Sequence, residues 1–98
     1  MAHEGYHEPV DKLTPATMDF HRAVVSLIEE LEAVDWYNQR VDACGDPELK
    51  AILAHNRDEE IEHAAMTLEW IRRRNPVFDK ELRDTLFKSG PITGQHGG

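Results

Sequence analysis

The fold is decided by the stretch Asn56-Arg57-Asp58-Glu59-Glu60-Ile61-Glu62-His63-Ala64-Ala65-Met66, which contains the pair Glu60-x-x-His63. Residues three apart lie one above the other on the same face of an α-helix, so this carboxylate and this imidazole point the same way. The rest of that face is mostly apolar and consists of Leu49, Leu53, Asn56, Met66 or Thr67, and Trp70. A buried unpaired charge is costly. The stretch therefore predicts either a cation bound at this face or a carboxylate that stays neutral.

Length and composition limit the number of domains and the classes of function. The 98 residues are enough for one domain, and 19 Asp and Glu against 11 Lys and Arg give a net charge of −8. This balance disfavours nucleic-acid binding, which needs a basic face. No apolar run is long enough to cross a membrane, and the first residues lack the pattern of a secretory signal. Cys44 is the single cysteine, which fits a reducing compartment. We expect a cytoplasmic, soluble protein.

Two long helices are predicted. The first begins at Thr14-Pro15, a capping threonine before a proline at the first helical position. Apolar spacing of three and four then continues to Gly45 through Phe20, Val24, Leu27, Leu31, Val34, Asn38 and Val41, with Glu30 at the edge of this stripe. The break Cys44-Gly45-Asp46-Pro47 is short, so the second helix, from Pro47 to Asn75-Pro76, is expected to fold back antiparallel to the first.

The remaining segments are shorter. A third helix is predicted from Asp79 to Lys88, with Leu82, Leu86 and Phe87 on one side. Residues 1–13 are interpreted as a flexible arm; they hold a second match, Glu4-x-x-His7, which lacks an apolar helical face and is not expected to form a site. Residues 14–90 form the expected helical domain, and residues 91–98 a flexible tail.

The architecture follows from the number of layers. Two long helices and a short third are one layer, which cannot close a core around its own apolar stripe. Four-helix di-iron carboxylate proteins take a Glu from each of two helices and a Glu-x-x-His from each of the other two. This chain has Glu30, Glu60 and His63, half of that set. We therefore predict an all-α hairpin that dimerises into a ferritin-like four-helix bundle and completes the metal site.

Ligand hardness indicates the metal. Four carboxylates and two imidazoles suit a pair of iron or manganese ions, with calcium or zinc as surrogates on the same ligands. We expect Glu30 to bridge the ions, Glu60 and His63 to bind one ion per chain, and Tyr37 to orient a ligand carboxylate through a hydrogen bond. Ferrous iron held in this way has open positions for dioxygen, which points to iron oxidation.

The long helices resemble those of the encapsulated ferritins, the iron-oxidising cargo of encapsulin shells. The resemblance covers residues 29–43, the turn at 46–49 and residues 51–70, and continues into Leu86-Phe87 and Gly90-Pro91-Ile92-Thr93. It implies a ferroxidase with two irons per dimer, five dimers in a ring-shaped decamer, and residence inside an encapsulin nanocompartment that stores the mineral. It also implies that Glu29, Glu32 and Trp36 line an outer site through which metal enters. The family's apolar targeting motif is not found at Gln95-His96-Gly97-Gly98.

Other interpretations remain open. Alone, Glu60 and His63 could be a surface ion pair, Glu29 and Glu32 solvated acids, and Trp36 and Trp70 packing residues where subunits meet. His55 and Glu59 are expected to form a solvated pair. The alternative functions are a peroxide-consuming di-metal enzyme and a non-catalytic helical module that assembles and binds cations.

Overall fold

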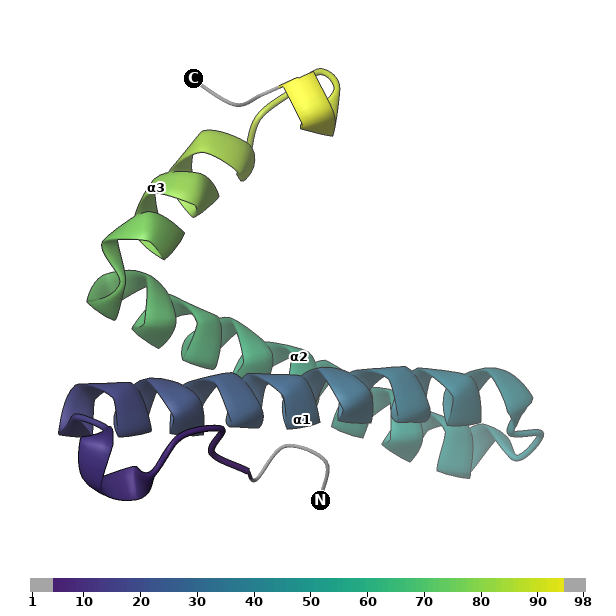
Figure 1. Cartoon of the computed structure of the whole chain (residues 1–98). Helices are drawn as coiled ribbons and strands as arrows, with labels where there is room; N and C mark the ends of the chain where they lie inside the picture. The colour runs from purple at the N-terminus through teal and green to yellow at the C-terminus, as the bar shows by residue number, and fades with distance from the viewer. Residues whose placement is uncertain (1–4, 95–98) are drawn as a thin grey trace.

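The computed structural model describes residues 5–94, so Glu4 of the second Glu-x-x-His match, with the rest of 1–4, and residues 95–98 lie outside the described part. A short 3-10 helix, η1 (Val10–Lys12), precedes three α-helices, α1 (Pro15–Ala43), α2 (Pro47–Arg74) and α3 (Pro76–Thr85), and a second 3-10 turn, η2 (Ile92–Gly94), follows them (Figure 1). No strand is present in these residues. The all-α prediction is confirmed.

Side-chain caps and prolines set the starts of the long helices. The Thr14 hydroxyl accepts a hydrogen bond from the Thr17 backbone N–H at 3.1 Å, and the Asp46 carboxylate accepts one from Leu49 at 2.8 Å. Pro15 and Pro47 occupy first helical positions, where a missing N–H leaves no bond unmade. The predicted limits of both helices agree with the structure because these signals act locally.

The predicted start of the third helix was wrong. Asn75 and Pro76 end α2 but also begin α3, because the Asn75 side chain accepts hydrogen bonds from the backbone N–H groups of Val77 at 3.0 Å and Phe78 at 2.9 Å. The helix ends at Thr85 rather than Lys88. Leu86 is extended, and Phe87 takes a left-handed φ of 59° with its side chain fully exposed. One asparagine thus caps a helix that starts three residues earlier than predicted.

Helices α1 and α2 lie antiparallel and α3 turns away from them, so the chain forms an open V (Figure 1). The chain measures 50 × 41 × 18 Å along its principal axes. The smallest dimension is less than two helix diameters of about 10–12 Å. The hairpin is therefore a single layer of helices, as predicted.

Burial is sparse in this layer. Among residues 5–94, only Ala64 (8% exposed) and Ile71 (0%) are buried. Leu31, Leu49 and Met66, which belong to the predicted apolar stripes, are all about half exposed. The predicted apolar stripes are thus largely exposed in one chain. None of the helices in the described part combines the length and apolarity needed to cross a membrane.

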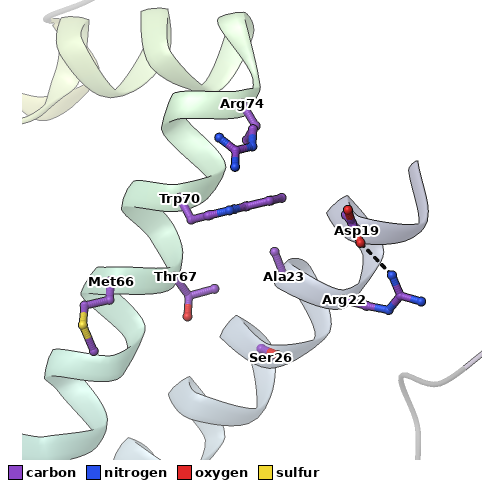
Figure 2. Close-up of a pocket in the computed structure, with 8 residues that line it drawn as sticks. All are labelled: Asp19, Arg22, Ala23, Ser26, Met66, Thr67, Trp70 and Arg74. Atoms are coloured by element: carbon purple, nitrogen blue, oxygen red, sulfur yellow. Dashed lines mark hydrogen bonds and ion pairs between the residues drawn. The ribbon is translucent and has the colours of Figure 1, made fainter. Parts of the chain in front are cut away.

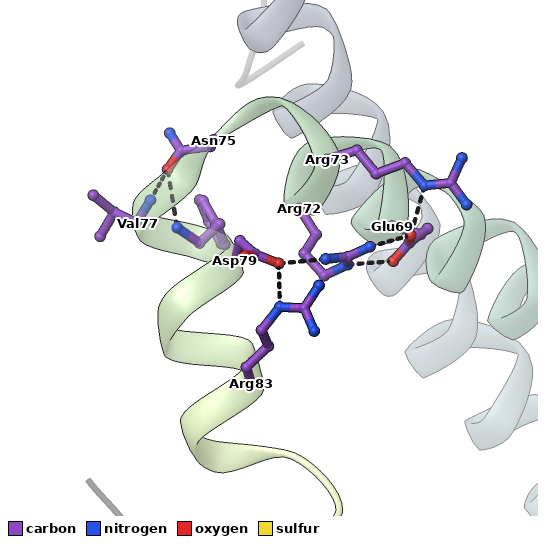
Figure 3. Close-up of polar contacts among 8 residues, drawn as sticks. Glu69, Arg72, Arg73, Asn75, Val77, Asp79 and Arg83 are labelled. Carbon is purple, nitrogen blue, oxygen red and sulfur yellow. Dashed lines mark hydrogen bonds and ion pairs between the residues drawn. The ribbon is translucent and has the colours of Figure 1, made fainter. Parts of the chain in front are cut away.

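A network of ion pairs joins α2 to α3 (Figure 3). The Arg72 guanidinium donates to both oxygens of Glu69, each at 2.7 Å, and also to Asp79 at the start of α3. Arg73 donates to Glu69 at 2.7 Å, and Arg83 donates to Asp79 at 2.9 Å. On the other side of the junction, the rings of Phe20 and Phe78 lie 6.3 Å apart. The network and the ring contact together fix the direction in which α3 leaves α2.

Residues 5–14 contact the start of α1. The Tyr6 ring lies 4.6 Å from the His21 ring, centroid to centroid, and η1 leads into the Thr14 cap. The flexibility predicted for residues 1–13 stays a prediction.

Acid should release α3 from α2. Hydrogen bonds from Arg72 and Arg73 lower the pKa of Glu69 to about 2, and Arg72 also lowers the pKa of Asp79. A lowered pKa stabilises the folded state above the carboxyl's ordinary value of 4.5, and the stabilisation is lost as pH falls toward about 2. The protection of the α3 amides against hydrogen exchange, relative to the intrinsic exchange rate at each pH, should therefore fall between about pH 5 and pH 2.

Two variants test the cause. Arg72→Met should make the α3 amides exchange quickly already at neutral pH. Lys80→Met, which removes the 2.6 Å pair with Asp84 inside α3, should leave the acid profile unchanged. Equal protection of α3 in the Arg72→Met variant and the parent would show that the network does not hold α3.

Candidate metal-binding site

The predicted pair on α2 is formed. His63 Nδ1 and Glu60 Oε1 lie 2.8 Å apart, and the side chains are 46% and 26% exposed. The hydrogen bond with Glu60 raises the pKa of His63, and the negative charges of Glu60, Glu30 and Glu62 add to this shift. A protonated imidazole here donates to the carboxylate. Both groups are thus half-open to solvent on one face of α2.

Glu30 lies on α1. Its negative charge contributes to the raised pKa of His63 on α2. The Oε1 atom of Glu30 is buried, and no hydrogen-bond donor reaches it. A buried carboxylate oxygen without a donor is costly, and a bound cation would remove that cost.

The donor set fits iron or manganese, because these ions take carboxylate and imidazole ligands. Within residues 5–94 of one chain, no three His, Cys, Asp or Glu side chains converge closely enough to hold an ion. The hairpin therefore offers an incomplete ligand set. Glu30, Glu60 and His63 remain the side chains that could hold iron if further ligands came from outside the chain.

The other predicted residues lie on α1 around Glu30. Tyr37 is half-buried, and the Arg40 guanidinium lies 5.3 Å from the centre of its ring; its hydrogen bond to a ligand carboxylate stays a prediction. Glu29 and Glu32 are exposed, and Trp36 is 53% exposed. On α2, His55 Nε2 lies 3.4 Å from Glu59 Oε2 in an exposed pair.

An open groove lies between α1 and α2 (Figure 2). It has a volume of about 610 Å³ and is lined on α1 by Asp19, Arg22, Ala23 and Ser26 and on α2 by Met66, Thr67, Trp70 and Arg74. The Arg74 guanidinium covers the Trp70 ring at 4.7 Å. Met66 and Thr67 follow His63 by one helical turn, and Ser26 precedes Glu30 by one turn. The candidate site and the groove therefore share one open face of the hairpin.

Sequence reasoning missed a contact between the helices. Arg57 on α2 donates a hydrogen bond to the Asn38 side chain on α1 at 3.1 Å. A signal was present, because Asn38 is a polar residue inside the apolar stripe of α1. Sequence reasoning also missed the Arg72 network, because its carboxylate partners Glu69 and Asp79 lie on two different helices.

An all-helical hairpin that carries a Glu-x-x-His pair on its second helix is typical of the ferritin-like class. The sequence matches the EncFtn-like family over residues 5–89. The chain therefore belongs to this family of encapsulated ferritin-like proteins, as the sequence analysis expected.

Individual relatives agree. The chain is 66% identical to an "Encapsulated ferritin-like protein" of Rhodospirillum rubrum over 89% of its own length and 62% of the relative's, so it spans less than two thirds of that protein. It is 58% identical to a "Ferritin-like protein" of Thermotoga maritima, over 92% of this chain and 79% of the relative. It is also 40% identical to an "Encapsulin nanocompartment cargo protein EncC" of Myxococcus xanthus, over 87% of this chain and 68% of the relative.

A solved structure has the same fold. The crystal structure of a protein from Nitrosomonas europaea superimposes with a TM-score of 0.87 at 70% sequence identity, covering 91% of this chain and 98% of the other.

The pKa of His63 is directly measurable. In the metal-free protein, the imidazole should titrate above 6.5, because protonation strengthens its hydrogen bond to Glu60. The interaction therefore stabilises the fold below 6.5 and is lost as pH rises through the raised value. Glu60→Gln should lower the midpoint measured by NMR, whereas Glu59→Gln, which alters the His55 pair, should not. An unchanged His63 midpoint in Glu60→Gln would contradict the contact.

Proposed function

We propose that this protein is a ferroxidase that oxidises Fe(II) to Fe(III) with dioxygen at a di-iron site formed between two copies of the chain. The observation that carries the proposal is the Glu60–His63 pair beside a buried Glu30 oxygen that lacks a donor. Iron is the substrate here, and two ions would occupy each dimer.

Each side chain has a role in this proposal. Glu30 bridges the two ions, while Glu60 and His63 of each copy hold one ion apiece. Tyr37 orients a ligand carboxylate by a hydrogen bond. Each Fe(II) gives up one electron, so the pair of ions passes two electrons to dioxygen. Carboxylates favour the Fe(III) product because they supply negative charge next to the higher charge of the oxidised ion.

The single-layer hairpin supports the dimer. One chain leaves Leu31, Met66 and the groove beside Trp70 open, while it buries only Ala64 and Ile71 among residues 5–94. A second hairpin across a two-fold axis would cover these apolar surfaces and add its own Glu30, Glu60 and His63. Folding of the bundle and completion of the site are then one event.

Charge distribution supports assembly beyond the dimer. Residues 72–88 contain six Lys and Arg and three Asp and Glu, which gives a net charge of +3. Residues 1–71 contain five Lys and Arg and sixteen Asp and Glu, which gives a net charge of −11. The basic segment includes α3 and the exposed Phe87 that follows it, so it suits the acidic hairpin of a neighbouring dimer. We propose that five dimers form a ring in this way, with Glu29, Glu32 and Trp36 lining an outer site through which Fe(II) enters.

Encapsulin is the proposed partner. The relatives from R. rubrum and M. xanthus carry the words "encapsulated" and "encapsulin nanocompartment cargo" in their names. By this likeness, the ring would work inside an encapsulin compartment, where the shell stores the Fe(III) mineral.

Activity should depend on the three proposed ligands. Mixing Fe(II) with the assembled protein in air should produce ferric absorbance, and Glu60→Ala or His63→Ala should slow this by more than about 100-fold, since even partners of ligands cost 10–100-fold. His55→Ala, which removes an exposed histidine from the same helix, is the matched control. Oxidation at the parental rate in both ligand variants would exclude this site and favour a non-catalytic module.

Stoichiometry should reveal the shared site. Native mass spectrometry should find two iron ions for every two chains, and a ten-chain species at low salt. Adding salt should dissociate the ring before the dimer, because charge attraction is screened while apolar burial is not. A stable monomer that holds two iron ions would contradict the shared site.

A further inference from the structure

A hydrogen bond crosses the hairpin near the proposed site. Arg57 Nη1 on α2 donates to Asn38 Oδ1 on α1 at 3.1 Å, and the two residues are 19 apart in the sequence. Arg57 Nε donates to Asp58 Oδ1, also at 3.1 Å, and the Arg57 side chain is 26% exposed. The guanidinium thus has two partners near the surface, the Asn38 side chain across the hairpin and the Asp58 carboxylate beside it.

The bond lies between the turn and the site. Arg57 precedes Glu60 by three residues, less than one turn of α2, and Asn38 follows Glu30 by eight residues, about 12 Å along α1. The turn at residues 44–46 is farther away, since Glu30 precedes Cys44 by fourteen residues, about 21 Å of helix. A small change in the angle between the two helices at the turn becomes a large displacement at the distance of Glu30. A hydrogen bond between the helices closer to Glu30 and Glu60 limits that displacement.

The apolar contact between the two helices of one chain is shallow. Among the described residues, Ala64 and Ile71 alone are buried, and the other apolar side chains of α1 and α2 stay partly exposed. A slip of one turn shifts one helix along the other by about 5.4 Å. Such a slip would carry Glu30 away from Glu60 and His63.

We propose that Asn38 and Arg57 are positioning residues, whose hydrogen bond sets the register of α1 against α2 and so holds Glu30 opposite Glu60 and His63. This inference rests on the proposed function. It assigns the pair no contact with iron. The bond acts through the helices, by fixing where the proposed ligands stand before an ion arrives.

A positioning role of Arg57 and the direct effect of its positive charge predict opposite changes in cation binding. Arg57 carries a positive charge less than one turn from Glu60, so charge alone predicts that its removal tightens cation binding. A positioning role predicts instead that removal of Arg57 weakens cation binding. Leucine at position 38 would extend the apolar stripe, so Asn38→Leu should keep the hairpin folded while it removes the acceptor. Asn38→Asp keeps an acceptor oxygen and strengthens the bond by its charge.

The test measures Co²⁺ affinity of the assembled protein by calorimetry, with helical circular dichroism and melting temperature recorded in parallel. Asn38→Leu and Arg57→Met should each bind Co²⁺ about tenfold more weakly, as expected when partners that orient ligands are lost. The double variant should be no weaker than either single variant, because both remove the same bond. Asn38→Asp should bind at least as tightly as the parent. Gln39→Leu, which removes the 3.1 Å bond to Asp35 within α1, is the matched control and should match the parent.

The outcomes distinguish a failure of the proposed function from a failure of the positioning role of Asn38 and Arg57. Parental Co²⁺ affinity in Glu60→Ala and His63→Ala would overturn the proposed function itself. Loss of affinity in those variants, with parental or tighter affinity in Asn38→Leu and Arg57→Met, would overturn the positioning role alone. A lower melting temperature with unchanged Co²⁺ affinity would likewise overturn it, since this is the result of a merely structural bond. If Asn38→Leu does not fold, Arg57→Met decides the question.

Discussion

The constraint on which this structure depends is the open apolar face of a single helical layer. A hairpin only 18 Å thick cannot surround its own side chains, and the described chain buries Ala64 and Ile71 alone. Few side chains are therefore buried within one chain, and the apolar faces of its helices stay largely open. The Glu60–His63 pair, at which the proposed metal site would form, is likewise partly open to solvent.

Much of the fold could be predicted because its signals are local. Thr14-Pro15 and Asp46-Pro47 each combine a side-chain cap with a proline, and the structure begins α1 and α2 at those prolines. The start of α3 was misjudged for a reason of the same kind, since Asn75-Pro76 was read as a stop when it is also a cap. The direction of α3 could not be predicted, because it depends on Arg72 bridging Glu69 and Asp79 across two helices.

In the candidate site, too, contacts within one helix could be predicted and contacts between helices could not. The contact between Glu60 and His63 follows from helical spacing, and the structure forms it at 2.8 Å. The approach of Glu30 depends on the register between two helices, which periodicity leaves undetermined to within a turn. Asn38 was visible as a polar residue in an apolar stripe, but its partner Arg57 could be recognised only in three dimensions.

The separation of charge along the chain has a further consequence. A basic segment at 72–88 and an acidic hairpin give each protomer a large electric dipole moment. Two such molecules approaching in solution experience a torque that favours head-to-tail encounters and disfavours parallel ones. The Debye length at physiological ionic strength is about 8 Å, so this orienting force acts mainly in the last few ångströms before contact. Ionic strength would thus govern how fast copies meet in the correct orientation, independently of how tightly their apolar faces adhere afterwards.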